Sequence, residues 1–134
     1  MIGIIISGHG LFAEGMKSSV ELISGEQDNL FTINFLENIG VDKFKKSLRN
    51  TLEEVEKKFD EVILFTDIPG GTPFNQAAYL LEEYKDILIV GGVNLPIILD
   101  TVLNNEATLD EIRNSITSMS ENAFIVIDNE VLKK

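Results

Sequence analysis

The sequence contains no cysteine and only one histidine, His9. Without thiols the protein can form no disulfide, no Cys-ligated zinc or iron–sulfur centre and no cysteine nucleophile. One imidazole also excludes a multi-histidine metal site within one chain. We therefore expect no metal site, and any chemistry that requires an imidazole must use His9.

Basic residues are scarce, because 11 Lys and Arg stand against 22 Asp and Glu and give a formal net charge of −11. This balance argues against nucleic acid and anionic membranes as partners, and it allows a basic protein partner. The longest apolar stretch, residues 87–99, is interrupted by Gly91, Gly92, Asn94 and Pro96. It is shorter than the roughly 20 residues that a membrane span requires, and the N-terminus lacks the positive start of a secretory signal. We expect a cytoplasmic protein.

What the sequence does contain is an alternation of short apolar runs with amphipathic segments. Runs rich in β-branched residues predict buried strands, and apolar residues at steps of three or four predict helices. The predicted strands are residues 2–6, 30–35, 62–65, 87–90 and 124–127, and the predicted helices cover residues 12–23, 41–59, 72–81, 96–103 and 108–119. This order predicts one α/β domain over residues 1–134, with a doubly wound, mostly parallel sheet and helices on both faces.

Two polar segments follow neighbouring strands of this predicted sheet. Ligands of open α/β sheets bind beyond the carboxyl ends of the strands, where the strand order reverses. With the common strand order 2-1-3-4, His9 after the first strand and Asp67 after the third lie side by side. A carboxylate that accepts a hydrogen bond from the N–H of one ring nitrogen fixes the tautomer and leaves the other nitrogen as a nucleophile. The glycines on either side, Gly8 and Gly10, would allow a bulky group to approach the ring.

The segment Gly70-Gly71-Thr72-Pro73 opens the third predicted helix, with Thr72 as its N-cap and Pro73 at its first position. The first N–H groups of a helix lack intrahelical partners, and such an end binds phosphate. We expect Gly71 and Thr72 to hold a phosphoryl group that His9 receives and passes on. Such a transfer requires positioning and charge stabilisation, and it needs no metal, nucleotide or other cofactor.

Each of these residues also has a purely structural interpretation. A single histidine is often a surface or capping residue, and Asp67 before Pro69 and Gly70 is ordinary turn chemistry. Gly91-Gly92 and Asn94, after the fourth strand, could line the same rim or only cap and turn the chain.

Four segments of the sequence resemble the mannose-class EIIA proteins of the bacterial sugar phosphotransferase system. They occur in the order of that family and span most of the chain. The segments are His9-Gly10-Leu11-Phe12-Ala13-Glu14-Gly15, Gly25-Glu26-Gln27, Asp67 with Gly70-Gly71-Thr72-Pro73-Phe74-Asn75, and Gly92-Val93-Asn94-Leu95-Pro96.

The resemblance implies that His9 is the phosphorylated histidine, that Asp67 is its partner and that Thr72 lines the phosphate where the family usually has Ser. Phosphate would come from the carrier HPr and leave to an EIIB protein, which phosphorylates sugar entering through a membrane permease. Members of the family are homodimers that exchange an antiparallel last strand, here residues 124–128. Ile97 departs from the Met of many members, and we expect EIIB to be a separate polypeptide.

Three alternatives remain. A receiver domain would carry phosphate on Asp67, but that class requires an acidic pair after the first strand to hold magnesium, where this sequence has Ser7, Gly8 and His9. The phosphocarrier subunit of dihydroxyacetone kinase shares the expected fold and histidine, although residues 70–75 favour the sugar-transport branch. A non-catalytic module that binds an anion or a protein at the rim is the third.

Overall fold

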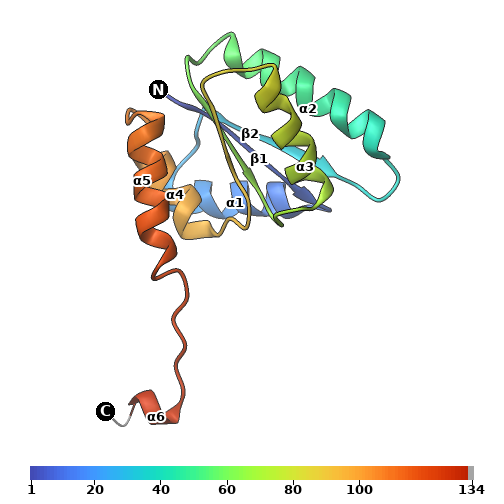
Figure 1. The fold of residues 1–134 in the computed structure, drawn as a ribbon. Helices are drawn as coiled ribbons and strands as arrows, with labels where there is room; N and C mark the ends of the chain where they lie inside the picture. Colours follow the sequence, from blue (N-terminus) through green and yellow to red (C-terminus); the bar gives the residue numbers. More distant parts are fainter. Residues whose placement is uncertain (133–134) are drawn as a thin grey trace.

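The computed structural model describes residues 1–132, so the last two residues of the expected 1–134 domain lie outside the described residues. Four parallel strands form one sheet in the order β2-β1-β3-β4, with α2 and α3 on one face and α1, α4 and α5 on the other (Figure 1). The elements are β1 (Gly3–His9), α1 (Phe12–Ser24), β2 (Leu30–Phe35), α2 (Val41–Glu56), β3 (Val62–Thr66), α3 (Thr72–Tyr79), a 3-10 turn (Leu80–Glu82), β4 (Ile87–Val90), α4 (Leu95–Leu103), α5 (Leu109–Ser120) and α6 (Asn129–Leu132). The doubly wound fold and its strand order are confirmed.

Strand β1 lies between β2 and β3, and the register of these strands sets up the site. Ser7 pairs with Ile33 of β2 on one side and with Thr66 of β3 on the other. Because the three strands are parallel and in this register, their carboxyl ends meet at one edge of the sheet. The residues that follow β1 and β3 are therefore brought together, as the sequence predicted.

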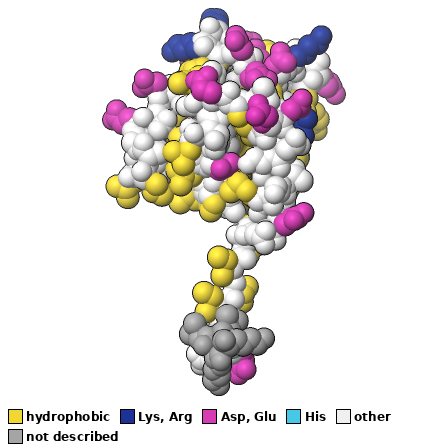
Figure 2. All heavy atoms as spheres, turned by 90° about the vertical axis from the view of Figure 1, so that its left-hand side faces the viewer, with side chains coloured by type: hydrophobic (Ala, Val, Ile, Leu, Met, Phe, Trp, Pro, Cys, Tyr) yellow, Lys and Arg dark blue, Asp and Glu magenta, His cyan; other side chains and the backbone are white. Residues whose placement is uncertain are grey.

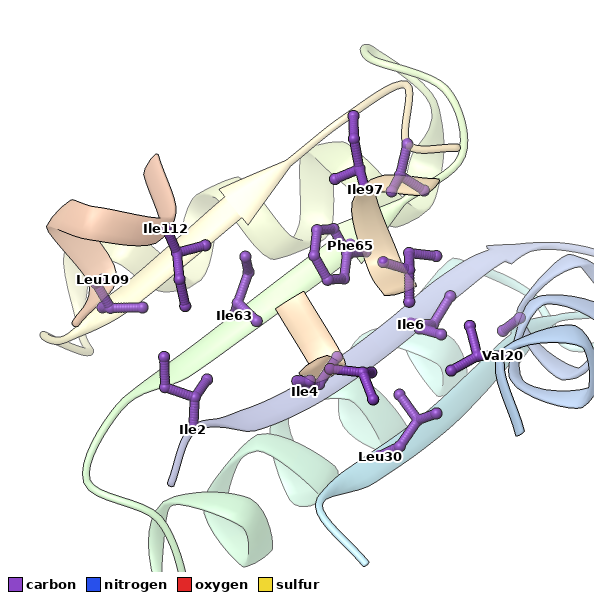
Figure 3. Close-up of a cluster of buried hydrophobic side chains, with 14 residues drawn as sticks. Ile2, Ile4, Ile6, Val20, Leu30, Ile63, Phe65, Ile97, Leu109 and Ile112 are labelled. Atoms are coloured by element: carbon purple, nitrogen blue, oxygen red, sulfur yellow. The ribbon is translucent and has the colours of Figure 1, made fainter. Parts of the chain in front are cut away.

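The strands are buried on both faces, which explains their continuous apolar runs. Along β1, Ile4 and Ile6 pack into the core under α1, α4 and α5, whereas Ile5 packs into the core under α2 and α3. Figure 3 shows the first of these cores, where Phe65 of β3 and Ile97 of α4 meet side chains from β1. Residue 97, which departs from the family pattern, is thus a core position.

The helices bury the apolar faces that the sequence predicted, but some of them begin or end at other residues than predicted. α2 buries Phe44, Leu48, Leu52 and Val55 but ends at Glu56, before the predicted end at residue 59. α5 begins with a capping box, in which Thr108 and Glu111 each satisfy a backbone N–H of the other. None of the helices within residues 1–132 is long and apolar enough to cross a bilayer.

The C-terminal segment differs from the sequence prediction. Residues 123–128 form no strand and leave the body of the molecule as an extended arm that ends in α6 (Figures 1 and 2). The apolar side chains of this arm are exposed, Phe124 by 86%, Ile125 by 84% and Val126 by 82%. The predicted fifth strand is therefore absent from the single chain, because a strand forms only where its backbone groups pair with a neighbour.

Candidate active site

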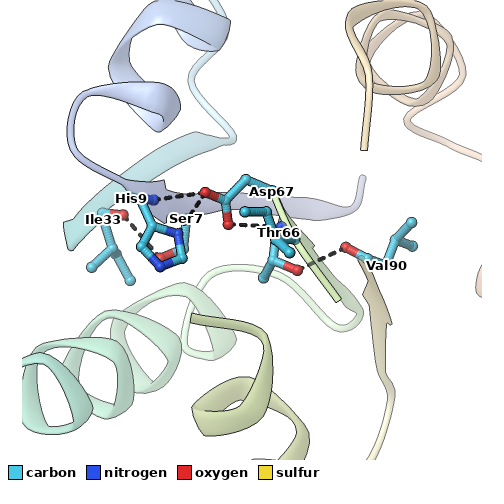
Figure 4. Close-up of polar contacts among 7 residues, drawn as sticks. Ser7, His9, Ile33, Thr66, Asp67 and Val90 are labelled. Carbon is cyan, nitrogen blue, oxygen red and sulfur yellow. Dashed lines mark hydrogen bonds and ion pairs between the residues drawn. The ribbon is translucent and has the colours of Figure 1, made fainter. Parts of the chain in front are cut away.

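His9 is the last residue of β1, and Asp67 holds it by two hydrogen bonds. The backbone N–H of His9 donates to Asp67 Oδ2 at 2.8 Å, and ring Nδ1 lies 2.8 Å from the same oxygen (Figure 4). The other carboxylate oxygen, Oδ1, accepts the N–H of Ile68 at 2.8 Å. The predicted pairing of His9 with Asp67 is present, and it fixes the ring relative to both strands.

The two partners differ in exposure, with 46% of the His9 side chain but only 10% of the Asp67 side chain open to solvent. Burial by itself raises the pKa of the Asp67 carboxyl, but the hydrogen bonds from the His9 N–H, the His9 ring and the Ile68 N–H outweigh it and hold the pKa below its usual value. An ionised carboxylate can only accept, so we assign the proton of a neutral His9 ring to Nδ1. The lone pair of Nε2 then faces away from Asp67.

Two neighbours border the His9 ring. The ring of Phe35, at the end of β2, makes an edge-to-face contact with it, with 5.6 Å between ring centroids and 73° between planes. Gly71 borders the ring from the α3 side, because a Cβ there would lie 3.0 Å from His9 Cε1 and 3.8 Å from Nε2. The bare Cα of Gly71 therefore keeps the space beside Nε2 open. Phe35 was missed from the sequence, although its place at the end of the strand beside β1 was a usable signal.

The start of α3 differs from the prediction by one residue. The helix begins at Thr72, and the N-cap is Gly71, which has an extended backbone with φ −75° and ψ 170°. Thr72 therefore makes no cap bond, and within the described residues its hydroxyl has no hydrogen-bond partner. The first N–H groups of a helix also lack intrahelical partners. This end of α3 can thus offer N–H groups and a hydroxyl to an anion at His9.

The glycines around His9 have roles that the sequence did not predict. A Cβ on Gly8 would lie 3.0 Å from Asp67 Cγ and 2.6 Å from Phe12 Cδ1. Gly8 thus makes room for protein side chains and not for a ligand beside the ring. Gly10 has a positive φ of 59°, which favours glycine on conformational grounds.

Other polar residues singled out in the sequence serve the fold. Asn94 caps α4 by accepting the N–H of Ile97 at 3.0 Å, which favours the interpretation that it caps and turns the chain. Gln27 binds back to Glu21 and Ser24 in the loop before β2, at the amino end of the sheet. Within residues 1–132, no group of three or more His, Cys, Asp or Glu side chains is placed to hold a metal ion.

Fold and site together place the protein among doubly wound α/β proteins that carry a histidine at the carboxyl edge of the sheet. The chain belongs to the family described as the PTS system fructose IIA component, whose model matches residues 3–117. It is an EIIA component of the phosphotransferase system, a phosphoryl carrier in sugar transport and hence a phosphotransferase.

Known proteins of this family are similar over nearly the whole chain. The fructose-specific EIIA component of Bacillus subtilis is 34% identical over 134 residues, which cover 99% of this chain and 91% of that protein. The sorbose-specific EIIA component of Lacticaseibacillus casei is 29% identical, over 88% of this chain and 85% of its own. A crystal structure of an EIIA component from Streptococcus agalactiae superposes with a TM-score of 0.81 at 33% identity, covering 94% of this chain and 97% of that one. Neither the receiver domain nor the dihydroxyacetone kinase subunit is supported by these similarities.

Proposed function

We propose that His9 is the residue that carries the phosphoryl group and that Nε2 is the atom that bonds to phosphorus. The observation that carries this proposal is the 2.8 Å contact between Nδ1 and Asp67, which occupies one ring nitrogen and directs the other toward solvent. The exposure of the His9 side chain, at 46%, allows a partner protein to reach Nε2.

The proposed reaction is an in-line transfer between two nitrogen atoms. The bond from phosphorus to the donor's imidazole nitrogen breaks while a bond from phosphorus to His9 Nε2 forms, and the proton on His9 Nδ1 stays in place. Positive charge that develops on the His9 ring is stabilised by the ionised Asp67 carboxylate. The phosphoryl oxygens face the start of α3, where N–H groups and the Thr72 hydroxyl offset their charge.

The proposed partners are the carrier HPr as donor and an EIIB protein as acceptor. Both must bring a reacting atom to Nε2, so both must cover the same edge of the sheet. Three exposed apolar residues follow the strands that end there: Leu11 after β1, Leu36 after β2 and Ile68 after β3. These three residues form an apolar rim around His9, and apolar side chains that gather on an exposed surface mark protein interaction sites. Contact with the membrane permease is indirect, through EIIB, and the proposed location is the cytoplasm.

We further propose that the protein forms a homodimer through the arm of residues 123–128. Its exposed apolar side chains support this assembly, as does the outer edge of β4, which pairs with no other strand within residues 1–132. An isolated strand edge is open to pairing with a further strand. The arm of a second chain supplies a segment of suitable length and composition.

The test uses phosphoenolpyruvate, HPr and the kinase that phosphorylates HPr, with the mass of the protein as readout. Wild type should gain one phosphoryl group, and His9→Ala should gain none while its circular dichroism spectrum stays unchanged. The modification should survive base and be lost in acid, whereas an acyl phosphate on Asp67 would be hydrolysed in base. Phosphorylation of His9→Ala at the wild-type level would refute the assignment.

A further inference from the structure

The turn after β4 contacts the segment that borders His9, on both sides of Gly71 and Thr72. Gly91 directly follows the last residue of β4. A Cβ on Gly91 would lie 2.7 Å from Phe74 Cδ2, 2.8 Å from Phe74 Cε2 and 3.1 Å from Pro69 Cγ. The rings of Pro69, in the loop after β3, and of Phe74, in the first turn of α3, thus both pack against the bare Cα of Gly91.

Position 91 requires glycine because a side chain there would clash with its neighbours, whereas position 92 favours glycine because of its backbone conformation. Gly92 has a φ of +71°, and its Cβ would make only ordinary contacts of 3.6 Å with Pro69. Gly91 is not among the glycines with positive φ, so its backbone would accept other residues. What a side chain at position 91 would meet is the pair of rings, at distances that real Cβ atoms essentially never show for Phe74.

Internal hydrogen bonds fix the conformation of the segment of residues 68–75, which contains both rings. Gly71 N–H donates to the Ile68 carbonyl at 3.1 Å, and Asn75 Nδ2 donates to the Gly70 carbonyl at 2.9 Å. These bonds join residues at most five apart, so they fix the shape of the segment but not its place relative to the sheet. The contacts of Pro69 and Phe74 with Gly91 join it to β4, which is part of the sheet.

We propose that Gly91 is a positioning residue for phosphoryl transfer. Pro69 and Phe74 pack against Gly91, and this packing determines where Gly71 and the start of α3 lie relative to His9 Nε2. Gly91 itself contacts neither the His9 ring nor a phosphoryl group bound to it. This inference rests on the proposed function of His9. The sequence left open whether Gly91 lines the edge of the sheet at His9 or only turns the chain. On this proposal it does neither, because it acts through Pro69 and Phe74.

Gly91→Ala tests the proposal, with Gly15→Ala as the matched control, because a Cβ on the exposed Gly15 of α1 would meet nothing within 4 Å. The assay measures the initial rate of phosphoryl acceptance over a range of phosphorylated HPr concentrations. A displacement of about 1 Å at a reacting centre can lower a rate about 10²-fold, so we expect a fall of that order in the maximal rate of Gly91→Ala. The donor concentration at half-maximal rate should change by a smaller factor than the maximal rate, because Leu11 and Leu36 of the rim lie outside the segment that the substitution displaces. Gly15→Ala should match wild type in both quantities.

A second background shows whether Gly91 acts through Phe74. Phe74→Leu removes Cε2 and replaces the rigid ring by a side chain that can rotate away from the new methyl group, so Gly91→Ala should lower the maximal rate by a smaller factor in that background. If Gly91→Ala alone does not fold, the double variant should restore both folding and transfer. A folded Gly91→Ala protein with the wild-type rate, an equal factor in both backgrounds, or a double variant that fails to restore transfer would overturn the proposal. A wild-type protein that accepts no phosphate would instead overturn the proposed function.

Discussion

A single oxygen of Asp67 holds both the main chain and the ring of His9. Oδ2 accepts the backbone N–H of His9 at 2.8 Å and contacts Nδ1 at 2.8 Å, while Oδ1 is occupied by the Ile68 N–H. The ring is therefore oriented relative to the strand that carries it, and not only relative to a neighbouring side chain. Groups held in this way lose little freedom when they react, which is how positioning accelerates a transfer.

Replacing the charge of Asp67 while keeping its shape tests this arrangement. Asp67→Asn retains an acceptor oxygen but cannot stabilise positive charge on the His9 ring, so phosphoryl acceptance should slow by roughly 10²-fold or more. Quenched-flow measurement of acceptance from phosphorylated HPr gives the rate, and circular dichroism reports folding. A variant that is folded and transfers at the wild-type rate would contradict the role assigned to Asp67.

The same carboxylate should make stability depend on pH in the acid range. Since hydrogen bonds hold the pKa of Asp67 in the folded state below its usual value, the folded protein binds this proton less tightly than the unfolded chain does. The carboxylate therefore stabilises the fold above the ordinary Asp pKa of about 3.9, and this contribution is lost as the pH falls toward the folded-state pKa. Urea unfolding should show that the stability gap between wild type and Asp67→Asn narrows as the pH is lowered through about 4. A gap that widens over that interval would show the opposite sign of linkage.

At the scale of elements, α3 matters chiefly through its first residues. Because Gly71 occupies the N-cap position, the Thr72 hydroxyl is not used up in capping its own helix. A phosphoryl group on Nε2 would find that hydroxyl beside the free N–H groups of the helix start. Capping at Gly71 thus leaves one more donor for the ligand.

Two variants of Thr72 separate the hydroxyl from the shape of the side chain. Thr72→Val keeps the branched shape and loses the hydroxyl, and Thr72→Ser keeps the hydroxyl. A hydrogen bond to a charged group contributes about 1.5–3 kcal/mol, so Thr72→Val should slow transfer about 10- to 100-fold. Thr72→Ser should stay near the wild-type rate. Equal rates for the two variants in the same acceptance assay would exclude a role for the hydroxyl.

The elements also show which parts of the structure a sequence can predict. The parallel sheet follows from the apolar runs, and the pairing of His9 with Asp67 follows from the rule for open sheets once the common strand order is assumed; the sheet, its order and the pairing are all present. The predicted cap of α3 is displaced by one residue, because Thr is a preferred N-cap residue and its presence at position 72 outweighed the glycine before it. The close packing against Gly8 and Gly91 could not be predicted, since it depends on side chains far away in sequence, such as Asp67 and Phe74. The fifth strand is not formed within the single chain, because a strand requires a neighbour and no local pattern records whether the same chain or a second copy supplies one.

At the scale of the whole molecule, charge and apolar surface are distributed differently. The net charge of −11 keeps the protein from associating without specificity, because like charges repel. Apolar side chains are nevertheless exposed at the rim around His9, and four consecutive ones are exposed along the arm, where Figure 2 shows apolar side chains projecting from the body. The small apolar rim suits a transient contact with a partner protein, whereas the continuous apolar arm suits a stable contact.

Removing the arm should therefore change the oligomeric state and leave the transfer site intact. Burying a Val, Ile or Phe side chain stabilises an assembly by about 1.5–3 kcal/mol, and the arm exposes four such residues in a row. We expect light scattering to report a dimer for the full chain and a monomer for a chain that lacks residues 123–134. A chain that lacks only residues 129–134 keeps the apolar run and should stay dimeric. Both shortened chains should still accept phosphate on His9, because β1, β3 and the start of α3 are unchanged. A full chain that is monomeric at every concentration, or a dimer that persists without the arm, would show that these side chains serve another contact.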